Sequence, residues 1–248
     1  MTHSQVACVQ SGFRVTSDIV NSDVSTLTGG NDAIIGSTQD DLLIDDACID
    51  VFHGGAGNDT ADYSDNFLAL NVQLNNGSLA GTVSSGGSRE LHFLVENIIS
   101  TNANDTFAGN DESNTFEGGG GNDTVDGEGG TDIVSYANAT SGVTVDLAIS
   151  RIGHAIGDGQ GTDQLDSVEG VIGSAFNDTI FGGSANDSVQ GGAGDDILLT
   201  GSRTTSFPFP GTDTIEGSSG NDTIGFALVV TVLPRRPWID LDRLDPDL

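Results

Sequence analysis

Three nine-residue segments of this chain share the order Gly-Gly-x-Gly-x-Asp-x-apolar-x. They begin at Gly54, Gly118 and Gly191. The glycines allow backbone conformations with positive φ, so the first half of each segment suits a tight loop whose carbonyl groups turn inward. The Asp adds an anionic oxygen, and the apolar residue two places later suits a narrow core. A chain built on this unit is predicted to form short strands joined by tight loops.

The nine-residue period extends well beyond these three segments. From Leu27 onward, Asp recurs at intervals of nine, and an apolar residue follows it two places later. The rows form four sets: Asp32, Asp41, Asp50 and Asp59; Asp105, Asn114, Asp123 and Asp132; Asp178, Asp187 and Asp196; and Asp213 and Asp222. Asp213 stands eight residues later than the nine-residue period from Asp196 requires, so 200–207 is predicted to be an inserted surface loop.

Two longer segments separate the sets and match each other. A shift of 73 residues places Tyr63 on Tyr136 and Glu96 on Glu169. Each segment has 37 residues, which is one more than two coils of 18, so the same architecture is predicted to continue through it. Residues 143–147 alternate between apolar and polar, as a half-buried strand does.

The predicted organisation has three parts. Residues 1–26 form an N-terminal cap or lead-in, 27–225 form the repeat region, and 226–248 form a C-terminal cap or secretion tail. Within the repeat region, the blocks are 27–62, 100–135, 173–199 and 208–225, and the spacers are 63–99 and 136–172. Phe226–Leu233 suits a last strand, which Pro234 ends because proline cannot donate a ladder hydrogen bond.

The repeated nonapeptide resembles the RTX (repeats-in-toxin) family of hemolysin-type calcium-binding repeats, with β-roll modules like those of serralysin-like proteases and alginate epimerases. The resemblance covers most of residues 27–225. It implies an all-β fold, namely a right-handed parallel β-roll or β-helix solenoid. It also implies several bound Ca²⁺ ions and an extracellular protein, exported without a cleaved N-terminal signal through a one-step (type I) secretion channel that reads an uncleaved C-terminal signal.

Simple electrostatics favours the same ligand. Two nonapeptides would complete one coil, so Asp105 would stack on Asp123 in the next coil at roughly 4.8 Å. Two carboxylates about 5 Å apart repel by roughly 3 kcal/mol at an effective dielectric constant of about 20. A divalent cation between them removes that penalty. Ca²⁺ takes about 6–8 oxygen ligands, whereas Mg²⁺ demands a small rigid octahedron and Zn²⁺ favours His and Cys.

The resemblance also implies which groups bind the metal. Backbone carbonyls at the second and fourth places of the nonapeptide join the Asp at the sixth. The predicted metal ligands are Asp32, Asp41, Asp50, Gly55, Gly57, Asp59, Asp105, Gly119, Gly121, Asp123, Asp132, Asp178, Gly183, Asp187, Gly192, Gly194, Asp196, Asp213 and Asp222. Asn114 lacks the charge, so a weaker site is predicted where it meets Asp132. The row 45–53 lacks the glycines, which predicts incomplete coordination by Asp50.

Composition excludes several classes of partner. The chain has 37 acidic and 7 basic residues and a formal charge of −30, which disfavours nucleic acid and acidic membranes because both need cationic contacts. No apolar run reaches the roughly 20 residues of a membrane span, and Met1–Asp18 lacks the pattern of a cleaved signal. Cys8 and Cys48 are predicted to be free thiols, so bound metal rather than disulfides is expected to stabilise the fold.

Catalytic patterns are missing from the sequence. The four histidines are isolated, so the zinc motif His-Glu-x-x-His is absent, as is Gly-x-Ser-x-Gly. We therefore predict a non-enzymatic module that folds on binding Ca²⁺ and has a structural, secretion-assisting or spacer role. Its predicted partners are a fused effector domain or an extracellular polysaccharide. The alternative is a carbohydrate-binding or adhesive module, but Tyr63 and Tyr136 are predicted to close the core rather than stack on sugars.

Overall fold

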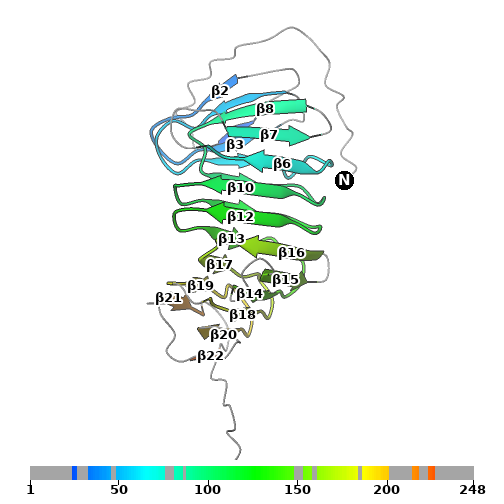
Figure 1. Ribbon diagram of the computed structural model, residues 1–248, viewed down its shortest axis with the longest axis vertical. Coiled ribbons are helices and arrows are strands. Elements are labelled where there is room, and N and C mark those ends of the chain that lie inside the picture. Colours follow the sequence, from blue (N-terminus) through cyan, green and yellow to red (C-terminus); the bar gives the residue numbers. More distant parts are fainter. Residues whose placement is uncertain are drawn as a thin grey trace, which may run out of the picture.

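The computed structural model describes residues 24–26, 33–45, 49–75, 81–85, 88–147, 153–157, 161–183, 186–200, 214–217 and 223–226. All regular structure in these ranges is β-strand, and the strands stack one after another along the longest axis of the molecule (Figure 1). The all-β class predicted from the sequence is therefore confirmed. In the same ranges, no helix is long and apolar enough to cross a membrane.

The strands of the described residues form two sheets, and successive strands within a block alternate between them. In spatial order, the nine-stranded sheet contains β1 (Val24–Thr26), β3 (Leu42–Ile44), β5 (Thr60–Asp62), β9 (Asn97–Ile99), β11 (Thr115–Glu117), β13 (Ile133–Ser135), β17 (Gly170–Ile172), β19 (Ser188–Gln190) and β21 (Thr214–Glu216). The thirteen-stranded sheet contains β2 (Ala33–Ile35), β4 (Val51–His53), β8 (Ser88–Phe93), β7 (Gly81–Ser85), β6 (Leu70–Gln73), β10 (Thr106–Asn110), β12 (Thr124–Glu128), β16 (Gly161–Asp166), β15 (Gly153–Gly157), β14 (Thr144–Asp146), β18 (Thr179–Phe181), β20 (Ile197–Thr200) and β22 (Thr223–Phe226).

Neighbouring strands within a block are parallel and pair residues that are 18 positions apart. Phe107 of β10 pairs with Val125 of β12, and Phe116 of β11 pairs with Val134 of β13. This register agrees with the predicted coil of two nonapeptides. Strand β1 pairs with β3 in the same way, although our sequence analysis placed residues 24–26 in the lead-in. Asp23 stands nine residues before Asp32, so the period begins one nonapeptide earlier than we noticed.

A thin apolar core lies between the two sheets. Side chains alternate between the two faces of a strand, so each three-residue strand points its middle residue inward. The buried middle residues are those predicted from the spacing to Asp: Ile34, Leu43, Phe52, Ala61, Phe107, Phe116, Val125, Val134, Ile180, Val189 and Leu198. The rings of Phe107 and Phe116, from opposite sheets, lie 5.4 Å apart. One inward residue per nonapeptide gives this fold little apolar burial.

The spacers depart from the predicted pair of parallel coils. Each adds a single parallel strand to the nine-stranded sheet but three strands to the other sheet. The middle strand of the three, β7 or β15, is antiparallel to both of its neighbours. Antiparallel strands need only a short connection between them, and Ser85 at the end of β7 pairs with Ser88 at the start of β8. The spacer residues therefore form hairpins instead of a second parallel coil.

Tyr63 and Tyr136 lie inside the array, at the start of each spacer. They are 1 % and 3 % exposed, so the prediction that they close the core is confirmed. The Tyr63 hydroxyl is hydrogen-bonded to Nε2 of His92, and the Tyr136 hydroxyl donates to Oδ2 of Asp163 at 3.0 Å. Burial, with nearby carboxylates, raises the pKa of both tyrosines well above its usual value. Burial also lowers the pKa of His92 to about 3, so this imidazole is neutral.

Candidate metal-binding loops

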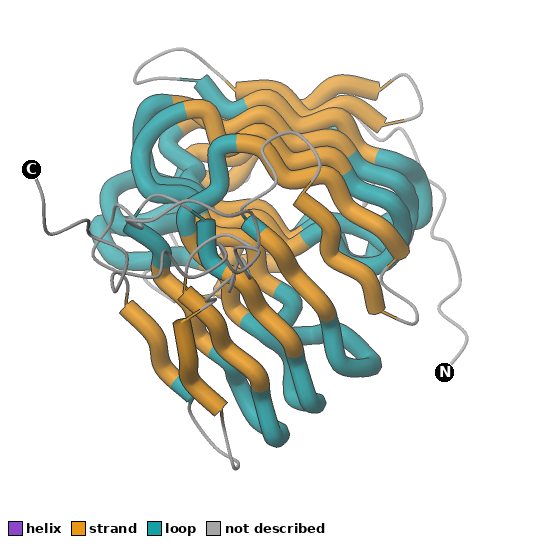
Figure 2. Tube along the Cα trace, turned by 60° about the horizontal axis from the view of Figure 1, so that its bottom comes forward, coloured by secondary structure: helices purple, strands orange, loops and turns teal. Residues whose placement is uncertain are grey.

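Loops that connect the two sheets lie at both ends of the strands (Figure 2). At the first edge, the chain passes from the thirteen-stranded to the nine-stranded sheet through loops 36–41, 54–59, 111–114, 129–132 and 182–187. At the second edge, it returns through loops 45–50, 100–105, 118–123, 173–178 and 191–196. Every loop ends with an Asp or Asn immediately before the next strand. The nine-residue period thus divides the acidic residues between two edges.

The Asp side chains at each edge form a hydrogen-bonded ladder along the array. Oδ1 of Asp123 accepts a hydrogen bond from the backbone N–H of Asp105 at 2.8 Å. The same bond joins Asp59 to Asp41 at 2.8 Å, Asp132 to Asn114 at 2.8 Å and Asp196 to Asp178 at 2.9 Å. Residues 18 positions apart are therefore adjacent, as the sequence predicted.

The second carboxylate oxygen of several ladder residues has no partner. Oδ2 of Asp59, Asp123 and Asp132 is buried without a hydrogen bond to any of the described residues, and these three residues are 0 %, 2 % and 1 % exposed. A buried ionised oxygen that lacks a donor is strongly unfavourable. A bound cation would supply the missing partner, so these residues fit a metal ion.

The first glycine of each loop leaves space beside that oxygen. A Cβ atom on Gly118 would lie 2.2 Å from Oδ2 of Asp123. A Cβ atom on Gly36 would lie 2.7 Å from Oδ2 of Asp41 and 1.9 Å from the carbonyl oxygen of Gly54, in the next coil. A carboxylate oxygen and a carbonyl oxygen thus converge on one point. This is the kind of oxygen donor set that Ca²⁺ prefers.

Six of the seven glycines predicted as carbonyl ligands, all except Gly183, have backbone conformations that favour glycine. Gly119 and Gly121 have φ of 76° and 119°, and the same sign holds at Gly55, Gly57, Gly192 and Gly194. A Cβ atom on Gly119 would also lie 2.0 Å from the carbonyl oxygen of Thr101, one coil away. Glycine is therefore required at these places both for backbone conformation and for close stacking. Gly183 occupies the second place of loop 182–187 and is buried.

Other predicted ligands already have protein donors. Asp105 accepts from the Ser100 hydroxyl at 2.6 Å and from the Leu70 N–H at 2.7 Å. Asp178 accepts from the Ser174 hydroxyl at 2.8 Å and from the Val143 N–H at 2.7 Å. Each of these two residues ends the loop that follows a spacer at the second edge. In these loops, Ser stands at the first or the second glycine position of the nonapeptide. Their carboxylates therefore have less need of a cation than that of Asp123.

Three further predicted ligands, Asp41, Asp50 and Asp187, are buried at the ends of their loops. Asp41 accepts from the Ser37 N–H at 2.5 Å. Asn114 donates from Nδ2 to the carbonyl oxygen of Glu96 at 2.9 Å, and the weaker site where it meets Asp132 stays a prediction. Outside the described residues lie Asp32, Asp213 and Asp222, together with Cys8, Cys48, residues 201–207 and the tail after Phe226.

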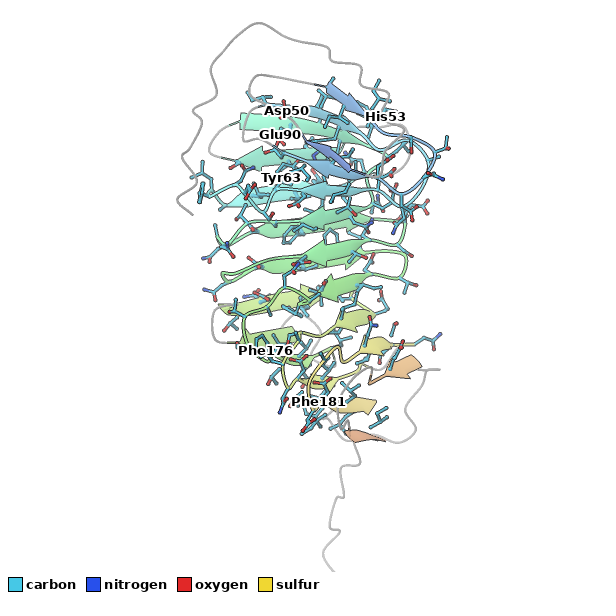
Figure 3. All side chains as sticks on the ribbon, turned by 180° about the vertical axis from the view of Figure 1, so that it is seen from behind. Asp50, His53, Tyr63, Glu90, Phe176 and Phe181 are labelled. Carbon is cyan, nitrogen blue, oxygen red and sulfur yellow. The ribbon has the colours of Figure 1, made fainter. Side chains whose placement is uncertain are left out.

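The sequence analysis missed four acidic residues of the spacers that extend the ladders. Oε2 of Glu96 accepts the Asp59 N–H at 2.8 Å, and Asp163 and Glu169 accept equivalent bonds from Asp123 and Asp132, each at 2.9 Å. Glu90 precedes Leu91, which pairs with Val51, so it lies beside Asp50 (Figure 3). The signal that could have identified Glu96 and Glu169 is their distance from the core residue. Each stands two places before a buried apolar residue, Ile98 or Val171, just as Asp does in the nonapeptide.

Burial makes the metal-free ladders unfavourable when they are ionised. It raises the pKa of Asp123 from 3.8 to about 8, and the pKa values of Asp59, Asp132 and Asp163 to about 6. Backbone hydrogen bonds oppose the shift, and neighbouring carboxylates add to it at Asp59, Asp123 and Asp132. Across the described ranges, no three His, Cys, Asp or Glu side chains gather around one point, so a site in these loops must take most of its ligands from carbonyl groups.

Gly118→Ala is expected to weaken calcium binding by about tenfold. Its Cβ atom would lie 2.2 Å from Oδ2 of Asp123, and overpacking of this kind costs about 1–3 kcal/mol. Gly129→Ala is the matched control, because its Cβ atom would lie 3.4 Å or more from any neighbour. Calcium titration followed by circular dichroism measures both variants. Equal calcium midpoints for the two would contradict the role assigned to Asp123.

Sequence comparisons agree with this geometry. A family model described as the RTX calcium-binding nonapeptide repeat matches four copies, at residues 27–61, 99–134, 172–202 and 209–224. A search of curated proteins gave no match. The matched segments contain all the block loops described above, and repeats of this family bind several Ca²⁺ ions. The repeat blocks of this chain therefore belong to the RTX calcium-binding nonapeptide repeat family.

Proposed function

We propose that this chain is a calcium-dependent structural module of a secreted protein, and that it folds into a right-handed β-roll solenoid when Ca²⁺ binds between its stacked loops. The observation that carries the proposal is the set of buried, partnerless Oδ2 atoms on Asp59, Asp123 and Asp132. The family match supports calcium as the ion. The proposed module spans 27–225, between caps at 1–26 and 226–248.

The proposed ligands are the Asp carboxylates at the sixth place of each nonapeptide and the carbonyls at the second and fourth places. The strongest candidates are loops 54–59 and 118–123, where positive φ at the glycines and a partnerless Asp oxygen occur together. In loops 100–105 and 173–178, hydroxyl groups already bind the Asp. We expect those loops to contribute mainly through their carbonyls.

Folding coupled to calcium follows from the balance of energies. The core has one inward side chain per nonapeptide, and the formal charge is −30. Without a cation, charge repulsion opposes the stacking of acidic rows, so the binding free energy of the metal becomes folding free energy. RTX repeats are typical of secreted proteins, which favours a role in export, in stabilising a fused effector domain or as a spacer. Tyr63 and Tyr136 are buried, so neither ring is available to stack on a sugar.

The test is a calcium titration of the chelator-treated chain, followed by calorimetry and circular dichroism in parallel. We expect little strand signal at micromolar Ca²⁺, and a rise at millimolar Ca²⁺ that coincides with the heat of binding. Magnesium at the same concentrations is the control and should give a much smaller rise, because it demands a rigid octahedral site. An equal strand signal in chelator and in calcium would contradict coupled folding.

A further inference from the structure

Each spacer rejoins the nine-stranded sheet through an unusually short turn. Only residues 94–96 connect β8 to β9, and only 167–169 connect β16 to β17, whereas loops 36–41 and 54–59 at the same edge have six residues. Leu94 and Ser167 have φ of 49° and 54° in these turns. This conformation is uncommon for residues other than glycine and costs about 1–3 kcal/mol. The surroundings of both turns must therefore favour it.

The first turn places a carbonyl oxygen where a glycine carbonyl stands inside a block. A Cβ atom on Gly54 would lie 2.0 Å from the Leu94 carbonyl oxygen and 2.3 Å from Oδ2 of Asp59. Inside the first block, a Cβ atom on Gly36 would meet the Gly54 carbonyl oxygen at 1.9 Å and Oδ2 of Asp41 at 2.7 Å. The junction between block and spacer thus reproduces the arrangement of oxygens found between two coils of a block.

The second spacer repeats the arrangement with different residues. A Cβ atom on Gly127 would lie 2.1 Å from the Ser167 carbonyl oxygen and 2.5 Å from Oδ2 of Asp132. Glu169 then accepts the Asp132 N–H at 2.9 Å. Two spacers with different side chains at the turn therefore share one geometry.

Each junction also brings a second carboxylate to a buried oxygen that lacks a partner. Asp59 is fully buried, its Oδ2 has no hydrogen bond to the described residues, and its N–H donates to Oε2 of Glu96 at 2.8 Å. Asp132 is 1 % exposed and has the same partnerless Oδ2. Glu has one more methylene group than Asp, which gives the carboxylate a longer reach from the shorter turn.

There is room for a partly hydrated ion beside the first junction. A cavity of about 390 Å³ adjoins it, and its lining includes Gly57, Leu94, Glu96 and Glu112. Asn114 donates its side-chain amide to the Glu96 carbonyl, so that carbonyl oxygen already has a protein donor and the Glu96 carboxylate is the group left for a cation.

We propose that Asp59 with Glu96, and Asp132 with Glu169, each hold one Ca²⁺ ion at the junction between a repeat block and its spacer, with the carbonyls of Leu94 and Ser167 as further ligands. This inference rests on the proposed function. Glu96 and Glu169 lie outside the segments matched by the family model, so each site combines the Asp of a nonapeptide with ligands that the spacer supplies. Their ions connect each block to the strand that continues the nine-stranded sheet, β9 or β17.

The test counts bound ions in the full chain. We expect Glu96→Gln combined with Glu169→Gln to lose two Ca²⁺ ions relative to the parent in titration calorimetry. Gln keeps an oxygen that can accept the Asp59 or Asp132 N–H, so the fold is perturbed little. Asp126→Asn combined with Glu216→Gln removes the same charge from exposed positions and should keep every ion. An unchanged ion count in the first double variant would overturn the junction sites.

The outcomes separate the two proposals. If the parent binds no Ca²⁺, the proposed function itself fails. If the parent binds Ca²⁺ and the Glu96→Gln, Glu169→Gln variant binds as many ions, only the junction sites fail. If that variant does not fold in calcium, anomalous diffraction from parent crystals grown with Ca²⁺ decides the question. A peak in contact with the carboxylates of Asp59 and Glu96 would support the junction site, and no peak there would overturn it.

Discussion

In chelator, lowering the pH from about 8 to about 5 is expected to increase the strand content of the chain, because the buried carboxyls have pKa values raised to between about 6 and about 8. A group whose pKa is raised by folding binds its proton more tightly in the folded state. Its contribution to stability is complete below the unfolded value near 3.8 and is lost as the pH rises through the folded value. Protonation of Asp123 and its neighbours would thus permit stacking without metal.

Calcium is expected to reverse this dependence on pH. Ligand carboxylates must be ionised to bind the ion, so protons compete with Ca²⁺ and the apparent affinity falls as the pH drops. The measurement is circular dichroism between about pH 5 and pH 8, in chelator and in millimolar calcium, with light scattering to exclude aggregation. A metal-free chain with more strand at pH 8 than at pH 5 would show that the ladder carboxylates are not buried as described.

Asp123→Asn is expected to have opposite effects with and without calcium. With calcium, the loss of one charged ligand should weaken binding by about tenfold or more, since ligand charge sets the affinity of oxygen sites for Ca²⁺. In chelator at about pH 8, the variant should retain more strand than the parent, because it lacks a buried acid whose pKa is raised to about 8. Asn can still accept the N–H of Asp105 through its own Oδ1, so the backbone ladder is preserved.

Asp126→Asn is the control for that variant. Asp126 lies on β12, three residues from Asp123, and its side chain is exposed. It accepts the Glu128 N–H at 3.2 Å, a bond that Asn can keep. Both variants remove one negative charge from nearly the same place. Calcium midpoints that moved equally would show that net charge, rather than a site at Asp123, controls binding.

Much of this architecture could be predicted because the nine-residue period encodes it directly. The burial of Phe52, Phe107 and Phe116 and the adjacency of Asp105 and Asp123 all follow from two spacings, namely two residues from Asp to the core and 18 residues from coil to coil. These spacings hold wherever one nonapeptide follows another without interruption.

The spacers could not be predicted in the same way. The alternation of residues 81–85 suits a parallel and an antiparallel strand equally well, whereas in the structure β7 is antiparallel to both of its neighbours. Glu96 and Glu169 escaped notice because each ends a turn of only three residues, which is shorter than the nonapeptide loops at the same edge. The shorter turn breaks the period even though the carboxylate still reaches the ladder. Period alone therefore identifies the blocks but not the residues that join them.

The unequal numbers of strands in the two sheets affect the shape of the whole array. Each spacer puts three strands into one sheet and one into the other, which adds roughly 10 Å to one face at about 4.8 Å per strand. Because β9 still pairs directly with β5 and β11, the shorter face has no gap, and curvature or twist must accommodate the difference. Blocks on the two sides of a spacer are therefore not related by a simple shift along a straight axis, and the acidic edges do not continue as straight rows through a spacer.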